Sequence, residues 1–164
     1  MEFFYFFLFL SILSCSLVTG FIFTYAVVVM PGLSKLNDKE FLKAFQVTDA
    51  VIQNRQPIFM LIWVGSIVFV LGLIFTSITH VGLSKTWLIV LVALIYLLGV
   101  QGTTIFIHLP LNNHIQKLNL EKLKDENLRN ERLNFENKWN FFNNIRTTIA
   151  FFVSLTLLIF LTIT

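Results

Sequence analysis

Charged residues are scarce in this chain. Asp, Glu, Lys and Arg make up 13% of its 164 residues, whereas about 25% is usual for soluble domains, and 56% of the residues are hydrophobic. The few charges lie almost entirely between four long apolar runs, none of which contains Asp, Lys or Arg. This distribution excludes an ordinary soluble domain.

Cysteine is nearly absent as well. Cys15 is alone, which excludes an intramolecular disulfide and a cysteine metal cluster. The net charge of +3 comes from basic residues interleaved with acidic ones in segment 117–146, a pattern that argues against a nucleic-acid partner. We therefore expect no nucleic-acid partner and no structural metal or haem.

The four apolar runs are long enough to cross a lipid bilayer. They are Phe3–Met30, Ile58–Thr79, Trp87–Leu109 and Thr147–Ile163. A spanning helix needs roughly 20 residues (range about 17–25), and a longer run can tilt. The sequence predicts an all-α membrane protein, with residues 1–164 forming one integral membrane domain built on a bundle of four transmembrane helices.

Lys and Arg predict the orientation of the bundle. Of the 12 basic residues, only Lys85 lies in the turn after the second run; the others lie between runs one and two or between runs three and four. The positive-inside rule places both basic connections in the cytoplasm and both termini outside, in what we expect to be a bacterial inner membrane.

The two basic connections have helical patterns of their own. Met30-Pro31-Gly32 should end the first helix, and Asn37 with Glu40 is a capping pair for an amphipathic helix over 38–54, expected on the cytoplasmic membrane surface. Segment 113–144 is polar and should form a helical hairpin that continues into the fourth span. Small residues such as Gly20, Gly72 and Gly99 mark expected contacts between helices.

The segment His108-Leu-Pro-Leu-Asn-Asn-His114 concentrates polar groups at one membrane boundary. Pro110 lacks a backbone N–H, so the third helix should kink or end there and free carbonyl groups. Beyond the hairpin, Trp139, Asn143 and Arg146 follow at i, i+4 and i+7, which places them on one helical face.

These residues are predicted to share a pocket at the cytoplasmic boundary. It would be bounded by Pro110, Asn112, Asn113, Trp139, Asn143 and Arg146, with Gln101 or Thr104 at its floor. A buried cation needs partners, and the expected partners of Arg146 are the freed carbonyls and the amide oxygens of Asn112 and Asn113.

Other interpretations of the same residues stay open. His108 and His114 could be metal ligands or interfacial residues, or one of them could act as an acid/base. His80 belongs to the opposite face, so a site with three histidines is excluded. Asn113 with Gln116 could cap a helix after Pro110. Trp139, Asn143 and Arg146 could be simple interface anchors.

Several of these motifs together resemble the anthrone oxygenase-like family of small membrane proteins. The resemblance rests on Met30-Pro31-Gly32-Leu33, Phe45-Gln46, Pro57-x-Phe59, Pro110-Leu111-Asn112-Asn113 and Trp139-x3-Asn143-x2-Arg146. It covers nearly the whole chain in order and implies four spans. His108 departs from the family, many members of which have another residue before Leu-Pro.

The resemblance implies an oxygenase that converts anthrone-like or quinone-like aromatic substrates without an evident metal or flavin, hence no cofactor. His108 or His114 would then be the base and Arg146 the cation beside the developing oxyanion. Asn112, Asn113 and Asn143 would orient the substrate, with Trp139, Gln101 and Thr104 completing the ligand site.

A second hypothesis is a non-catalytic membrane protein that binds a hydrophobic small molecule, or that serves as a homo-oligomer or a subunit of a larger membrane complex. A transporter is less favoured, because the sequence has no inverted repeat and no ionisable residue near the membrane midplane.

The orientation can be tested by labelling a single cysteine. In a Cys15→Ser background, Asp125→Cys should stay unreactive towards an impermeant thiol reagent in intact cells and react after permeabilisation. Labelling of intact cells would overturn the orientation, since residue 125 belongs to a basic connection.

Overall fold

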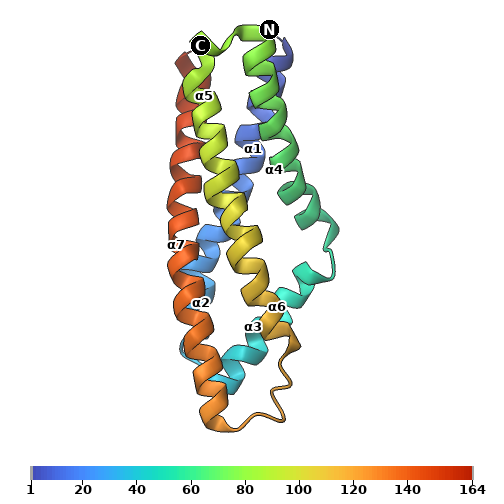
Figure 1. Ribbon diagram of the computed structural model, residues 1–164, viewed down its shortest axis with the longest axis vertical. Helices are drawn as coiled ribbons and strands as arrows, with labels where there is room; N and C mark the ends of the chain where they lie inside the picture. Colours follow the sequence, from blue (N-terminus) through green and yellow to red (C-terminus); the bar gives the residue numbers. More distant parts are fainter. Residues whose placement is uncertain (1, 164) are drawn as a thin grey trace.

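A computed structural model describes residues 2–163, which contain helices and no strand. Four helical spans run side by side, with both termini at one end of the bundle (Figure 1). The spans are Glu2–Leu33, Pro57–Val81, Leu83–Lys117 and Asp125–Ile163, each long and apolar enough to cross a membrane. The prediction of an all-α integral membrane protein with four transmembrane helices is confirmed.

Short π-helical segments divide the first three spans. The first span comprises α1 (Glu2–Thr24), η1 (Tyr25–Val29) and α2 (Met30–Leu33), and the second α4 (Pro57–Thr76) and η2 (Ser77–Val81). The third comprises α5 (Leu83–Ile95), η3 (Tyr96–Gly102), η4 (Thr104–His108) and α6 (Leu109–Lys117). The fourth is the single helix α7 (Asp125–Ile163), and α3 (Asp38–Gln53) lies between the first two spans.

The first helix ends at Leu33, directly after Met30-Pro31-Gly32, as predicted, whereas the third helix does not end at Pro110 but continues to Lys117, which corrects that alternative. A π-helical segment directly precedes each of these helical stretches, so the N–H of Met30 donates to the Tyr25 carbonyl and that of Leu109 to the Thr104 carbonyl, five residues back. The wider turn leads the chain into α2 and α6, where each proline takes one of the first two helical positions, and its missing N–H leaves no hydrogen bond unmade there.

The connection that contains α3 forms as its capping residues predict. The Asn37 side chain accepts from the Glu40 N–H, and the Glu40 carboxylate accepts from the Asn37 N–H. This capping box starts α3, and Pro57 begins α4 behind a Gln56 side chain that accepts from the Phe59 N–H.

The apolar face of α3 packs on protein, which corrects the expectation that this helix lies on the membrane surface. Phe41, Leu42 and Phe45 are buried, and the Phe45 ring lies 4.5 Å from that of Phe135 in α7. Lys39 donates to Glu121 in the loop after α6, at 2.7 Å, and this contact lowers the pKa of that carboxyl. Thus α3 closes the end of the bundle opposite the termini (Figure 1).

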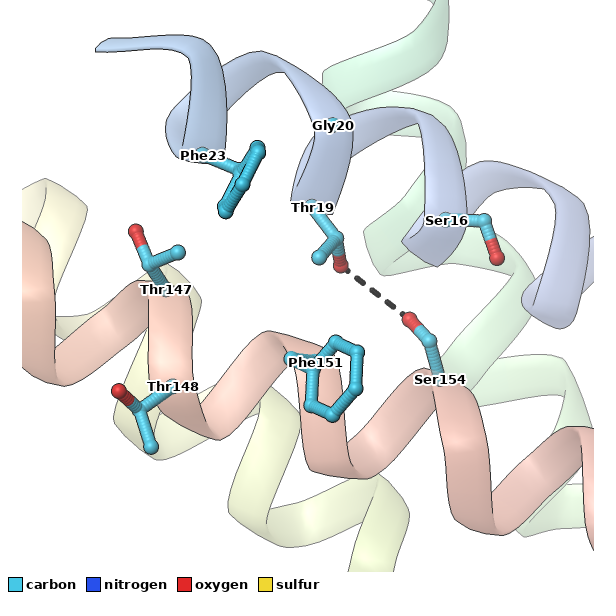
Figure 2. Close-up of a pocket in the computed structure, with 8 residues that line it drawn as sticks. All are labelled: Ser16, Thr19, Gly20, Phe23, Thr147, Thr148, Phe151 and Ser154. Carbon is cyan, nitrogen blue, oxygen red and sulfur yellow. Dashed lines mark hydrogen bonds between the residues drawn. The ribbon is translucent and has the colours of Figure 1, made fainter. Parts of the chain in front are cut away.

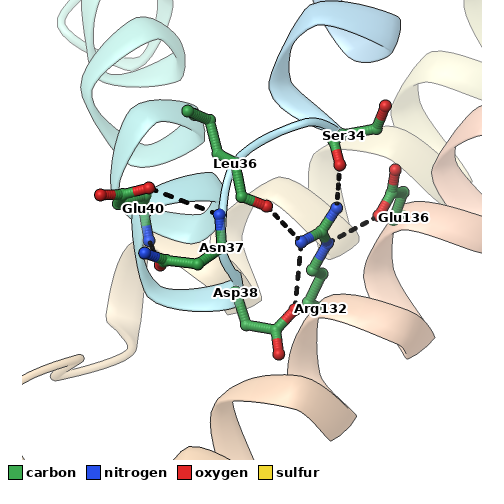
Figure 3. Close-up of polar contacts among 7 residues, drawn as sticks. All are labelled: Ser34, Leu36, Asn37, Asp38, Glu40, Arg132 and Glu136. Carbon is green, nitrogen blue, oxygen red and sulfur yellow. Dashed lines mark hydrogen bonds and ion pairs between the residues drawn. The ribbon is translucent and has the colours of Figure 1, made fainter.

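Arg132 of α7 fastens the segment that leads into α3 (Figure 3). Its guanidinium donates to the backbone carbonyls of Ser34 and Leu36 and to the carboxylates of Asp38 and Glu136. The same group lies 4.6 Å from the centre of the Phe41 ring. One side chain therefore ties the first span, the start of α3 and the fourth span together.

Small and hydroxyl-bearing side chains make close contacts between the membrane-spanning helices. Thr19 of α1 and Ser154 of α7 share a hydrogen bond of 3.2 Å (Figure 2). A Cβ atom added at Gly72 would lie 2.3 Å from the Phe7 ring, and one at Gly99 would lie 2.8 Å from Ile149. Gly20, in contrast, faces open space, so it is not a point of close helix approach.

Gly72 and Gly20 offer a matched pair of variants. Gly72→Ala should lower the free energy of unfolding by about 1–3 kcal/mol, because the new methyl group forces the Phe7 ring to move in a packed interface. Gly20→Ala adds the same group where nothing lies within 4 Å and should be neutral or slightly stabilising. Equal unfolding temperatures of the two variants in detergent would contradict this packing.

Candidate functional site

A cavity of about 330 Å³ lies between the spans, towards the end closed by α3. Its volume is at the lower end of the roughly 300–1,000 Å³ typical of small-molecule sites. Aromatic rings supply much of its wall: Phe21, Tyr25, Phe45, Phe59, Trp63 and Trp139. Phe59 and Trp63 are stacked at 5.3 Å, and flat surfaces of this kind suit a flat aromatic ligand.

Four of the polar side chains that line the cavity lie in π-helical segments. Tyr25 lies in η1, Gln101 in η3, and Thr104 and His108 in η4. A π-helical turn adds one residue and so shifts which side chains face inward, a device common at functional sites. The first and third spans thus turn polar groups from π-helical segments towards the same space.

Arg146 is the buried cation of the cavity lining and is only 5% exposed. Its Nε–H donates to Asn143 Oδ1 at 3.0 Å and its Nη1 group to Thr104 Oγ1 at 2.9 Å. The guanidinium carbon lies 5.6 Å from the centre of a Trp139 ring, within range of a cation–π interaction. Within residues 2–163 no carboxylate lies within ion-pair distance of this cation.

The partners of Arg146 differ from those expected from the sequence. Neither Asn112 nor Asn113 accepts from the guanidinium, because their side chains are engaged by Asp49, Trp139 and Gln53. Within residues 2–163 the guanidinium donates to no backbone carbonyl near Pro110 either. A neutral amide and a hydroxyl, both from the membrane part of the chain, solvate the cation instead.

His108 is buried in the cavity wall and is 2% exposed. Its ring meets Trp139 edge-on at 5.0 Å, with the backbone of Phe142 beside it. Neither ring nitrogen makes a well-formed hydrogen bond within the described part of the chain. A neutral imidazole always has one nitrogen lone pair that can accept a proton, so His108 offers an unused base to a ligand in the cavity.

Gln101 adds an unused acceptor. Its amide nitrogen donates to Ser66 Oγ at 3.0 Å and to the Tyr96 hydroxyl at 3.1 Å, which fixes the orientation of the amide. The Oε1 atom is buried and has no hydrogen-bond partner within residues 2–163. Buried polar atoms without partners are rare in proteins and indicate a place for a water or a ligand.

A chain of hydrogen bonds links Trp139, Asn112 and Asp49 at the end of the cavity that α3 closes. The indole N–H of Trp139 donates to Asn112 Oδ1 at 3.0 Å, and Asn112 Nδ2 donates to Asp49 Oδ1 at 2.8 Å. Gln116 and Gln53 donate to Asp49 Oδ2 at 3.0 and 3.2 Å. A carboxylate that is 3% exposed is therefore held by three amides and no cation.

Sequence reasoning missed Asp49, although a signal was present. Asp49 follows Phe41 and Phe45 at four-residue steps, so it lies on the apolar face of α3. An acidic residue on a buried face requires partners, and that rule could have singled it out.

Four residues predicted for the site, Pro110, Asn113, His114 and Asn143, do not line the cavity. Asn113 accepts from Gln53 on the exposed side of α6, and His114 pairs with Glu131 at 2.7 Å, also on the surface. Asn143 lies behind Arg146, where it holds the guanidinium and donates to the Ile22 carbonyl. The capping interpretation of Asn113 and Gln116 is wrong, because both lie inside one continuous helix.

A second cavity, of about 540 Å³, lies between α1 and α7 (Figure 2). Its lining consists of Gly20, two phenylalanines and hydroxyl side chains such as those of Thr147 and Ser154. It contains no ionisable side chain, so it lacks the groups for acid–base chemistry or for binding a charged ligand. The cavity around Arg146 is therefore the candidate site.

The fold and the site define a four-span membrane protein with an aromatic-walled internal cavity that carries a buried cation. Residues 59–156, more than half of the chain, match the sequence model of the anthrone oxygenase family. The chain belongs to that family. Comparisons with curated proteins and with solved structures gave no significant match. The matched range contains Gln101, His108, Asn112, Trp139 and Arg146, whereas Tyr25 and Asp49 lie outside it.

The link between Asp49 and Trp139 can be tested with two neighbouring asparagines. Asn112→Ala should lower the free energy of unfolding by about 1–3 kcal/mol, because it removes one partner from a buried carboxylate and the partner of a buried indole. Asn113→Ala removes one exposed contact and should change stability by less than about 0.5 kcal/mol. Similar losses in both variants, measured by thermal unfolding, would contradict the network.

Proposed function

We propose that this protein is a membrane-embedded oxygenase of a lipophilic aromatic substrate, anthrone-like or quinone-like, that needs no cofactor. The observation that carries the proposal is Arg146, a buried cation that has no counter-ion among residues 2–163 and lines an aromatic-walled cavity. Membership in the anthrone oxygenase family supports the same reaction class. An anion that forms on a flat ligand would serve as the counter-ion of Arg146.

The reaction is balanced without a further reactant. One anthrone and one dioxygen give one anthraquinone and one water. Removal of a proton from the methylene carbon leaves an enolate-like anion, which reduces dioxygen and forms a carbon–oxygen bond to it. The terminal oxygen of the resulting peroxide anion then takes up that first proton and becomes a hydroperoxide. Loss of the second proton from the same carbon then breaks the O–O bond, and the departing hydroxide takes a proton to become water.

The side chains around the cavity match these steps. His108 is the proposed base: it takes the first methylene proton and returns it to the peroxide, then takes the second proton and passes it to the departing hydroxide. The Arg146 guanidinium is the proposed stabiliser of the oxyanion, aligned by Asn143 and Thr104. His114 takes no part in this mechanism, because its ring lies on the surface in contact with Glu131.

A lipophilic substrate would enter from the bilayer. Met60 of α4, Ile105 of η4 and Leu109 of α6 line the cavity and are also exposed on the lipid-facing side. We expect the end of the bundle that carries α3 to face the cytoplasm, as the distribution of Lys and Arg predicts.

Turnover by the purified protein in lipid nanodiscs tests the function. Anthrone should be converted to anthraquinone with matching uptake of dioxygen, faster than in empty nanodiscs, which correct for autoxidation. Arg146→Gln should lower kcat/KM by about 100-fold or more, and His108→Gln by roughly 100-fold. Arg146→Lys should retain part of the activity, because it keeps the positive charge.

Arg129→Gln is the matched control, since Arg129 is exposed on α7 and does not line the cavity. Its kcat/KM should equal that of the wild type. If the wild type binds anthraquinone but never accelerates anthrone oxidation, the protein is a non-catalytic binder of hydrophobic ligands. Equal rates for the Arg146→Gln and Arg129→Gln variants would remove Arg146 from the mechanism.

A further inference from the structure

Two buried charges of opposite sign line the same cavity without pairing. Arg146 has only neutral partners, and Asp49 accepts only from the amides of Asn112, Gln116 and Gln53. Within residues 2–163 neither group takes part in an ion pair. Both residues line the cavity, so a ligand there would be exposed to a positive group and a negative group.

The two charges belong to different ends of the cavity. Arg146 is bonded to Thr104 and Asp49 to Asn112, and these two residues lie eight positions apart along the third span. At 1.5 Å per residue this separation corresponds to about 12 Å along the helix, slightly less through a π-helical turn. The two buried charges are therefore separated along the third span, with Arg146 near Gln101 and Asp49 near α3. Arg55, which follows α3 and also lines the cavity, is exposed, so its charge is screened by solvent.

The orientation of the Asp49 carboxylate is fixed. Oδ1 accepts one hydrogen bond from Asn112, and Oδ2 accepts from both Gln116 and Gln53. A carboxylate has about four acceptor positions, so one of them, on Oδ1, stays free. Asn112 is itself held by the indole of Trp139, a side chain of the cavity wall. The free acceptor position thus belongs to a group that cannot rotate away from a ligand.

We infer that Asp49 is a specificity-determining residue, which selects flat aromatic ligands with a neutral hydrogen-bond donor at the α3 end and rejects ligands with an anionic group there. The inference rests on the proposed function, because that function puts a flat aromatic ligand in this cavity. A hydroxyl or amide can donate to the free acceptor of Asp49. A ligand carboxylate cannot donate a hydrogen bond to Asp49, and the two negative charges would repel each other.

Binding of two quinones of equal shape tests the inference without any turnover. Anthraquinone-2-carboxamide and anthraquinone-2-carboxylate differ in one group, which is neutral in the first and ionised at pH 7 in the second. Quenching of tryptophan fluorescence reports binding in nanodiscs, since Trp63 and Trp139 line the cavity. Empty nanodiscs correct for partitioning into lipid. The wild type should bind the carboxamide about tenfold or more tightly than the carboxylate.

Variants assign this preference to Asp49. Asp49→Asn should raise the affinity for the carboxylate until the two dissociation constants differ by less than about threefold, because the repelling charge is gone. Asp49→Glu keeps the charge and should keep the preference. Glu121→Gln is the control, since it neutralises an exposed carboxylate far from the cavity lining and should behave as the wild type.

The outcomes separate this inference from the proposed function. Equal affinities for the two quinones in the wild type would overturn it even if Asp49→Asn failed to fold, and so would an unchanged preference in folded Asp49→Asn. Binding with the expected preference but no oxidation of anthrone would refute only the oxygenase proposal. If neither quinone binds the wild type, the cavity takes no flat aromatic ligand, and both proposals fail.

Discussion

The buried guanidinium of Arg146 is the group around which the rest of the structure is arranged. Burying a charge in a medium of low polarity costs several kcal/mol unless hydrogen bonds and opposite charges offset it. Here the compensation comes from Asn143, from Thr104 and from the face of Trp139. Asn143 also donates to the Ile22 carbonyl of α1. Through Asn143 and Thr104, Arg146 of the fourth span is thus connected to the first and third spans.

The requirement to face Arg146 accounts for the irregular backbone around it. Thr104 and His108 can reach the cavity because η4 widens the third span just before Pro110, and Tyr25 comes from a similar segment before Pro31. π-helical segments are less stable than α-helix and persist where function or packing requires them. In both spans the wide turn and the proline occur together, which keeps the helix continuous and turns polar side chains inward.

The end of the cavity that α3 closes depends on contacts between segments that are distant in sequence. Arg132 anchors the segment before α3 to α7, and the aromatic contacts of Phe45 with Phe135 and Trp139 hold α3 against the bundle. This packing buries Asp49 and brings it to Asn112. A helix that would otherwise lie on a membrane surface thereby becomes part of the cavity wall.

Local physical chemistry made much of the fold predictable. Run length and the absence of charge within the runs are enough to predict four membrane-spanning helices, since unpaired charges are costly in lipid and backbone polar groups must be satisfied within a helix. The capping box of Asn37 and Glu40 acts over three residues and forms as predicted. The proline rule located the end of the first helix to within one residue but not that of the third, where a π-helical turn precedes Pro110 and the helix continues.

The sequence by itself determined the membrane class, the four spans and which polar residues gather near one end of the bundle. Only the tertiary structure decided which of them face the cavity. Asn112, Trp139 and Arg146 line it, while Asn113 and His114, one or two positions from Asn112, point to the surface. The physical reason is helical rotation: each residue turns by about 100°, and the π-helical turns that fix the rotation depend on packing between spans. Asp49 joins the site for the same reason, through the docking of α3, which no local pattern encodes.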